Sequence, residues 1–218
     1  MSVEMIVTHI QQRFGYQALR RASELMQVHE TLSTGMEAVD GLLDGGLLKG
    51  ATHSLSGQAT SGATTLLYRT IASVQAQGVP AIYLEMEDLF DPPNAAATGV
   101  QIDRLLLISQ TSLKRALFLI RSLAQHQLPC LLVIDNPPTL PLAQLKATLR
   151  HAPLTLISLS PQPLSQMQVA LQCQRQSWQL DNQDIIGFNS DLCLIAHPFL
   201  PCRQRRMSFV VPREETNV

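Results

Sequence analysis

Short apolar segments alternate with stretches of helical periodicity over residues 51–160. Most of these segments are nearly continuous in apolar residues, which is typical of strands buried on both faces of a parallel sheet. They are ATHSLSG (51–57), AIYLEMED (81–88), LLLIS (105–109), CLLVID (130–135) and LTLISLS (154–160). Because parallel strands need crossover connections, the alternation predicts an α/β fold with a mostly parallel sheet flanked by helices.

The intervening stretches carry helix signals. Helices are predicted over residues 64–77, 91–98 and 111–127, and a short one within 33–50. The helix at 64–77 is expected to end at Gly78-Val79-Pro80. The short helix within 33–50 is expected to have Ser33 or Thr34 as its N-cap.

The tail differs from the rest of the chain. Residues 177–211 contain three strand-like pieces separated by turn signals, with no room for long helices. We expect this segment to add antiparallel strands at the C-terminal edge of the sheet.

The N-terminal segment 3–27 has apolar residues at i, i+4 spacing, which predicts an amphipathic helix. The stripe is Ile6, Ile10, Phe14, Ala18, Ala22 and Met26. This helix either packs on its own domain or acts as an arm that docks on a partner or a neighbouring subunit. The expected organisation is an N-terminal helix or arm at 1–30 and a single domain at 31–218.

Composition limits the classes of function. The net charge is −1 over 218 residues, which gives no reason to expect strong nonspecific nucleic-acid binding. The cluster Arg203, Arg205 and Arg206 is read as a solvated strand end or a local cationic patch. The four cysteines form no CxxC pair and the histidines have no ligand spacing, so no dedicated metal site is expected. The absence of a long apolar run predicts no membrane span and a cytoplasmic location.

The segment GQATSGATT (57–65) lies between the first predicted strand and helix. Glycines at both ends let backbone N–H groups turn inward, and the helix N-terminus adds positive potential. A phosphate group is therefore expected to bind here, and Thr64 is placed to reach a magnesium ion. The candidate nucleotide-binding residues are Gly57, Gln58, Ala59, Thr60, Ser61, Gly62, Ala63, Thr64 and Thr65. The alternative is that the glycines serve only close strand–helix packing.

Two carboxylates lie at the carboxyl ends of predicted strands, at the same edge of the sheet. Glu87 is placed to orient a water molecule, and Asp135 to hold magnesium directly or through water. Their alternatives are a surface turn residue for Glu87 and a turn cap before Asn136-Pro137 for Asp135.

Taken together, these motifs resemble the core of the RecA family of recombinases and their paralogues. STGMEAVDGLLDGGLLKG (33–50) is similar to the family's entry segment, and GQATSGATT resembles its Walker A loop. YLEMEDLFDP resembles the glutamate-bearing strand, GVQIDRLLLISQ the next strand and CLLVID the Walker B strand. The resemblance runs in register from Ser33 to about Ser160. It implies a RecA-like P-loop core with phosphate and magnesium positions at Gly57, Gly62, Thr64 and Thr65, a catalytic position at Glu87 and a Walker B position at Asp135.

The Walker A loop departs from the family pattern because Ala63 stands where the family has lysine. A charge-assisted contact of that kind contributes about 1.5–3 kcal/mol, so its loss weakens binding roughly 10- to 100-fold. The resemblance therefore implies weak binding of ATP or ADP with Mg²⁺ and slow hydrolysis. Lys49 and Arg69 are the nearby cations considered as substitutes.

Family members that bind DNA use loops after the fourth and fifth core strands. Here these loops are NPPTLPLAQ (136–144) and SPQPLSQMQ (160–168), which are rich in proline and free of lysine and arginine. Ser160 replaces a glutamine that couples nucleotide to DNA in the family. Direct DNA binding is therefore disfavoured.

The resemblance favours a non-enzymatic accessory protein in DNA repair, recombination or damage tolerance, similar to ImuA, the RecA-like partner of translesion polymerases, or to recombinase paralogues. Expected partners are recombinase or translesion polymerase components, or a second copy of the chain. One alternative is a slow ATPase or ATP-dependent switch, in which Glu87 and Asp135 are active. The other is a KaiC-like regulatory module that binds only protein.

Overall fold

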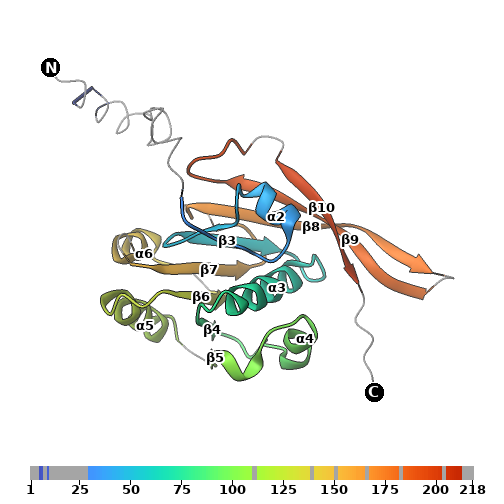
Figure 1. The fold of residues 1–218 in the computed structure, drawn as a ribbon, viewed down its shortest axis with the longest axis horizontal. Coiled ribbons are helices and arrows are strands. Elements are labelled where there is room, and N and C mark those ends of the chain that lie inside the picture. Colours follow the sequence, from blue (N-terminus) through green and yellow to red (C-terminus); the bar gives the residue numbers. More distant parts are fainter. Residues whose placement is uncertain are drawn as a thin grey trace.

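The computed structural model describes residues 5, 6, 9, 29–109, 112–137, 140–149, 152–164, 167–181, 184–202 and 205–212. Its centre is an eight-stranded sheet with helices on both faces (Figure 1). The strands are β3 (Thr52–Gly57), β4 (Ala81–Glu85), β5 (Leu105–Ile108), β6 (Cys130–Asp135), β7 (Leu154–Ser160), β8 (Val169–Asp181), β9 (Asp184–Ala196) and β10 (Arg206–Pro212). Their order across the sheet is β10-β9-β8-β3-β7-β6-β4-β5.

Six neighbouring strands, from β8 to β5, are parallel, and β9 and β10 pair antiparallel at one edge. The predicted fold class, a mostly parallel sheet with antiparallel strands from the C-terminal segment, is therefore confirmed. The parallel part brings the carboxyl ends of its strands to one edge, which is where ligands of such sheets bind.

Strand β8 begins earlier than the sequence predicted. It starts at Val169 and runs parallel to β3, with Cys173 opposite Gly57, before its far half pairs with β9. Glutamines interrupt its apolar residues, so the pattern was too weak to identify as a buried strand. The segment forms a strand because Val169, Leu171 and Cys173 are buried in the core.

The two faces of the sheet carry different helices. The helices α2 (Glu37–Leu42) and α3 (Ala63–Ala76) pack on one face, and α5 (Leu113–Gln125) and α6 (Leu142–Leu149) on the other. Within β6, Leu131 and Val133 contact the α3 side, whereas Leu132 and Ile134 contact the α5 side. The remaining short elements are β1 (Thr31–Leu32), β2 (Leu47–Leu48), α4 (Pro92–Ala97) and the 3₁₀ turn η2 (Ile102–Arg104).

The predicted cap of the short helix in 33–50 is wrong. Helix α2 starts at Glu37 with Met36 as its N-cap residue, and no side chain caps it. The hydroxyls of Ser33 and Thr34 instead donate to the Asp40 carboxylate, at 2.6 and 2.7 Å. Ser33 and Thr34 thus hold the segment before α2 by binding the Asp40 side chain, and they do not cap the backbone N–H groups of the helix.

The chain before β1 is described only in part. The predicted helix 3–27 lies outside the described residues except for Met5, Ile6 and His9. His29 stacks on Phe199, with ring centroids 3.7 Å apart, which brings the start of the core against the segment after β9. Of the helices that the structure describes, none is both long enough and apolar enough to cross a membrane.

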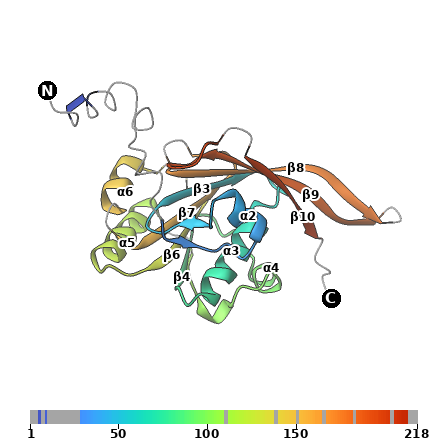
Figure 2. The same cartoon turned by 45° about the horizontal axis from the view of Figure 1, so that its top comes forward.

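The outer halves of β8 and β9 form a ribbon that extends beyond the helix-covered part of the sheet (Figures 1 and 2). Trp178 of β8 and Phe188 of β9 are opposite in register and meet edge to face, with ring centroids 5.8 Å apart. Trp178 and Ile186 are close to half exposed, and Leu180 is 62% exposed. The ribbon therefore presents an apolar surface that the described core does not cover.

Two glycines of the entry segment provide a test of this fold. Gly46 has φ +117°, and a Cβ there would clash with the carbonyl oxygen of Leu32. Gly41 lies inside α2 with open space around its Cβ position. We expect Gly46→Ala to lower the free energy of unfolding by about 2 kcal/mol or more.

Urea unfolding measures this change, and Gly41→Ala is the matched control. The control is expected to raise the free energy of unfolding by roughly 0.5–1 kcal/mol, since alanine is the better helix former. Equal effects of the two substitutions would contradict the described path of residues 41–48.

Candidate functional site

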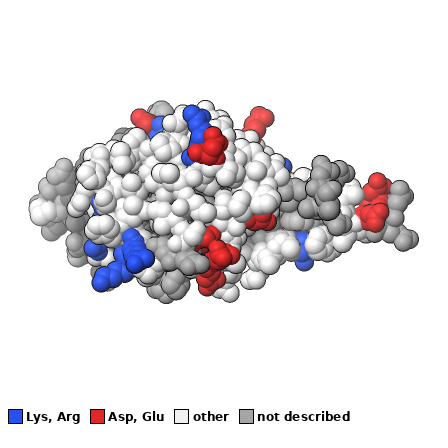
Figure 3. Space-filling view, turned by 90° about the horizontal axis from the view of Figure 1, so that it is seen from below, with Lys and Arg blue, Asp and Glu red and all other residues white. Residues whose placement is uncertain are grey.

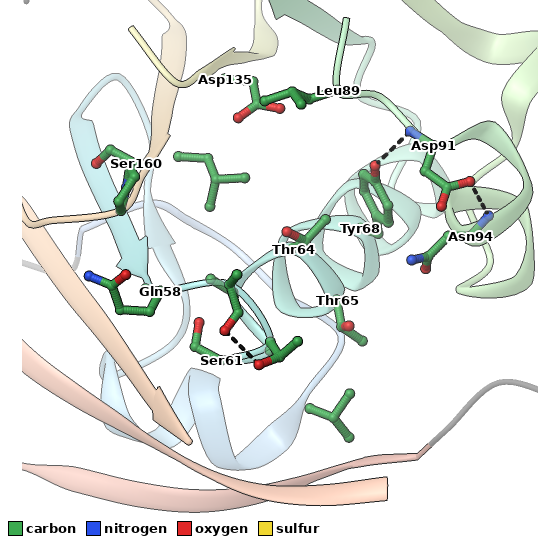
Figure 4. Close-up of a pocket in the computed structure, with 18 of the residues that line it drawn as sticks. Gln58, Ser61, Thr64, Thr65, Tyr68, Leu89, Asp91, Asn94, Asp135 and Ser160 are labelled. Carbon is green, nitrogen blue, oxygen red and sulfur yellow. Dashed lines mark hydrogen bonds between the residues drawn. The ribbon is translucent and has the colours of Figure 1, made fainter. Parts of the chain in front are cut away.

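A pocket of about 560 Å³ opens at the carboxyl ends of the parallel strands (Figure 4). Every residue from 57 to 65 lines it, together with Asp135 at the end of β6. Figure 4 shows Thr64 on α3 and Asp135 on opposite sides of the opening, with Tyr68, Asp91 and Asn94 at one end. The structure thus brings the predicted loop and the predicted Walker B carboxylate to one cavity.

The loop takes its shape from the ends of β3 and α3. Strand β3 ends at Gly57, Thr60 adopts φ +60°, and Gly62 adopts φ +86° as the N-cap residue of α3. The Leu66 N–H donates to the Gly62 carbonyl at 2.9 Å and closes the first helical turn. Among the described residues, the N–H groups of Ala63 to Thr65 have no acceptor. These donors and the helix dipole form a site for an anion.

The C-terminal strands support the loop from one side. The hydroxyl of Ser190 on β9 donates to the Ser61 carbonyl at 2.5 Å. A Cβ at Gly62 would lie 2.8 Å from the Val211 side chain of β10. The Ser61 hydroxyl is itself buried without a partner in the described part of the chain. The loop is therefore held in an open form with unused polar groups.

Asp135 faces α3 because it follows Leu131 and Val133 by the two-residue period of β6. It is 7% exposed, and the Tyr83 hydroxyl donates to its Oδ2 at 2.7 Å. Burial raises the pKa of the Asp135 carboxyl above its usual 3.8, the Tyr83 hydrogen bond opposes that rise, and the charges of Glu85 and Glu87 add to it. Burial also raises the pKa of Tyr83, so that it stays a donor.

Glu87 lies beside this pocket and lines a neighbouring hollow with Ser112 and Gln162. Asn136, which lines both cavities, donates from Nδ2 to Oε2 of Glu87 at 2.9 Å. Glu87, the predicted catalytic residue, therefore lies next to the loop's pocket but is separated from it by Asn136. Its catalytic role stays a prediction.

Glu85 is a residue that the sequence reasoning did not single out. It ends β4, is 2% exposed, and is opposite Asp135 in the register of β4 and β6. The Phe90 N–H donates to its Oε2 at 3.0 Å, which fixes the turn after the strand. Its position directly after the apolar run AIYL is the signal in the sequence that could have identified it.

The end of the pocket near α4 is lined by Tyr68, Leu89, Asp91 and Asn94. The Tyr68 hydroxyl accepts from the Asp91 N–H at 3.4 Å, and burial raises the pKa of Tyr68 to about 12. This end of the pocket therefore combines an apolar side chain with neutral and acidic polar groups.

The cations considered as substitutes for lysine do not reach the pocket. Lys49 pairs with Glu30 at 3.2 Å before the start of β3, and Arg69 is not among the lining residues. Arg175 on β8 was missed: its guanidinium donates to the Thr60 hydroxyl and lies 4.2 Å from the centroid of the Trp178 ring. Arg175 lies two residues after Cys173, which pairs with Gly57 in the sheet. The sequence did not predict the pairing of β3 with β8, so it did not place Arg175 near the loop.

The segments expected to correspond to DNA-binding loops carry no cation where they are described, 136–137, 140–144, 160–164 and 167–168. The Ser160 hydroxyl donates to the Gln162 carbonyl at 2.7 Å, which tightens the turn after β7. Of the arginine cluster, Arg205 donates to the Leu42 carbonyl at 3.2 Å and Arg206 is exposed, whereas Arg203 lies outside the described residues. Figure 3 shows charged side chains in small separate groups on the face it displays.

The loop fits a polyphosphate, because free N–H groups, the Thr64 hydroxyl and Asp135 line one cavity. Thr64 and Asp135 are the residues that would face a magnesium ion carried by the phosphates. Among the described residues, no group of three or more His, Cys, Asp or Glu side chains is arranged to hold a metal ion.

The family model described as the RecA N-terminal domain matches residues 1–176. The chain belongs to the RecA family. The RecA protein of Synechococcus elongatus is 32% identical to it over 157 residues, covering 71% of this chain and 44% of the relative. The RecA protein of Nostoc punctiforme is 32% identical over 153 residues, covering 69% and 43%.

A solved structure shows the RecA-like fold independently. The RadB recombinase has a TM-score of 0.62 and 20% identity, over 82% of this chain and 95% of that one. The chain spans less than half the length of the two RecA proteins. The RecA-family identity and the RecA-like fold are thus both confirmed.

The buried carboxyl of Asp135 gives a prediction for stability. Its pKa is raised in the folded chain, so the ionised form destabilises the fold, and stability falls as pH rises through the folded-state pKa. We expect Asp135→Asn to raise Tm at neutral pH by roughly 2–4 °C, since the amide still accepts from Tyr83 without carrying a charge. Thermal unfolding followed by circular dichroism measures this.

The gap between wild type and Asp135→Asn should close as the pH falls below 3.8, the usual pKa of the group. The control is Asp103→Asn, which removes the same charge from an exposed position in η2 and is expected to leave Tm unchanged. A lower Tm for Asp135→Asn at neutral pH would contradict the described surroundings of this carboxyl.

Proposed function

We propose that this RecA-family chain is an accessory protein in DNA recombination, repair or damage tolerance that binds nucleotide weakly and hydrolyses it slowly or not at all. The observation that carries the proposal is Ala63, a neutral residue at the first position of α3 inside an otherwise suitable phosphate loop. The RecA family supports the general role in recombination and repair, and the accessory role follows from the chemistry of the loop.

The electrostatics of the pocket support slow chemistry. Of the described residues that line it, none is lysine or arginine, whereas Asp91 and Asp135 bring carboxyl groups. Phosphoryl transfer needs positive charge where negative charge develops in the transition state. Backbone N–H groups alone supply partial charges, which support binding better than catalysis.

The contacts of the candidate catalytic carboxylate support the same proposal. The Glu87 carboxylate accepts from the Asn136 amide in the neighbouring hollow and does not line the pocket at the loop. A general base has to lie within hydrogen-bond reach of the water that it activates. Glu87 would have to leave Asn136 to meet a water beside the phosphates.

Protein partners are proposed on the surfaces that the core leaves uncovered. The ribbon of β8 and β9 exposes Trp178, Leu180 and Ile186. The sequence of segment 3–27 predicts a second apolar stripe. Recombinase or translesion polymerase components, or a second copy of this chain, are the partners we propose. Direct DNA binding is not proposed, because the described parts of the two candidate loops carry no cation.

A slow ATP-dependent switch is the second candidate function. The open loop with free N–H groups and the inward-facing Asp135 favour it, since an unused site has no need of either. The two candidates differ in whether turnover depends on Glu87.

Restoring the lysine tests the proposal. We expect the wild-type chain to bind Mg-ADP weakly and Ala63→Lys to bind it roughly 10- to 100-fold more tightly, because a charged contact to the phosphates is regained. Isothermal titration calorimetry measures both. Ala76→Lys, at the exposed far end of the same helix, is the control for added charge and should match wild type.

Turnover is measured in parallel with a phosphate-release assay. The proposal expects rates at background for the wild-type chain with Mg-ATP. Hydrolysis well above background that disappears in Glu87→Gln would replace the accessory role with the switch.

A further inference from the structure

Arg175 is the cation that the fold brings against the phosphate loop. In the parallel register of β3 and β8, Cys173 lies opposite Gly57, the last residue of β3. Arg175 follows Cys173 by two residues and therefore projects from the same face of β8, beyond the end of β3 where the loop begins. Strand pairing, not sequence proximity, creates this neighbourhood.

The guanidinium of Arg175 has two described contacts. It donates to the Thr60 hydroxyl at the apex of the loop, and it stacks over the Trp178 ring at 4.2 Å. No carboxylate pairs with it in the part of the chain that the structure describes, and the residue is exposed. Its positive charge is thus uncompensated while its position is fixed by an aromatic face.

Only the loop separates Arg175 from the main pocket. Gly57, Gln58, Ala59 and Ser61 line the main pocket on one side and the hollow that contains Arg175 on the other. Thr60, which Arg175 contacts, lines the main pocket. An arginine side chain has a long flexible stem and a planar fork of donors that matches phosphate oxygens.

We propose that Arg175 supplies, from strand β8, the positive charge that the loop lacks at Ala63. Its ligand is the polyphosphate of a nucleoside diphosphate or triphosphate. When the ligand binds, the guanidinium exchanges the Thr60 hydroxyl for phosphate oxygens and moves away from the Trp178 ring. This inference rests on the proposed weak nucleotide binding and explains which residue provides the remaining affinity.

The stacking partner makes the proposal measurable without any enzymatic activity. The chain contains one tryptophan, so its indole fluorescence reports on Trp178 alone. Withdrawal of the guanidinium from the ring should change the emission. We expect a saturable fluorescence change when the full-length protein is titrated with Mg-ADP, and a similar change with inorganic pyrophosphate, which carries the phosphates alone.

Affinity measured by calorimetry separates Arg175 from general effects of charge. Arg175→Ala should weaken Mg-ADP binding roughly 10-fold or more, and Arg175→Lys should lose less because the charge remains. Arg69→Ala is the control, because it removes the same charge from a residue that does not line the pocket. The Tm of each variant verifies that the substitution leaves the fold intact.

A double-mutant cycle with Ala63→Lys gives the sharpest result. If both cations serve the same phosphates, Arg175→Ala should cost much less affinity in the Ala63→Lys background than in the wild-type background. Equal affinity of wild type and Arg175→Ala, equal losses in both backgrounds, or no measurable binding by wild type would each overturn the role of Arg175. The first two results would leave the proposed function unchanged, whereas absence of binding by wild type would also remove weak nucleotide binding from it. The accessory role fails separately, if ATP turnover depends on Glu87.

Discussion

The unpaired backbone N–H groups at the start of α3 are the feature on which the rest of the site depends. They exist because Gly62 adopts a left-handed conformation that ends the loop and begins the helix without a side-chain cap. Parallel pairing of β3 with β7 and β8 fixes the strand that delivers the loop to this point. An anion is the natural partner of such a helix terminus, whatever side chain stands at position 63.

The distribution of charge around this terminus supports the proposed slow turnover. Asp135, Glu85 and Glu87 bring carboxyl groups to the ends of β4 and β6, and the raised pKa of Asp135 reflects its burial among them. No lysine on α3 balances these groups. Arg175 is the described cation in contact with the loop, and it comes from a strand whose outer half forms the exposed ribbon. In the proposed role of Arg175, its contact with Trp178 links nucleotide binding to the ribbon surface.

The sequence predicted most of the architecture, because burial on both faces of a parallel sheet leaves uninterrupted apolar runs such as CLLVID. It also placed the loop 57–65 and Asp135 at one edge, since parallel strands end together. It did not identify the first half of β8, where glutamines break the apolar pattern, nor Arg175, whose position depends on pairing across more than a hundred residues of chain. Glu87 was expected at the pocket because the motif spacing suggested it, whereas the turn after β4 carries it toward Asn136. The predicted helix 3–27 stays a prediction.

The central claim is that residues 57–65 still form an anion-binding cradle of main-chain amides. Nuclear magnetic resonance of ¹⁵N-labelled protein titrated with pyrophosphate tests it at the level of single amides. The largest chemical-shift changes are expected for the N–H signals of Gly62, Ala63, Thr64 and Thr65. Unchanged signals from these four residues at saturating pyrophosphate would contradict it.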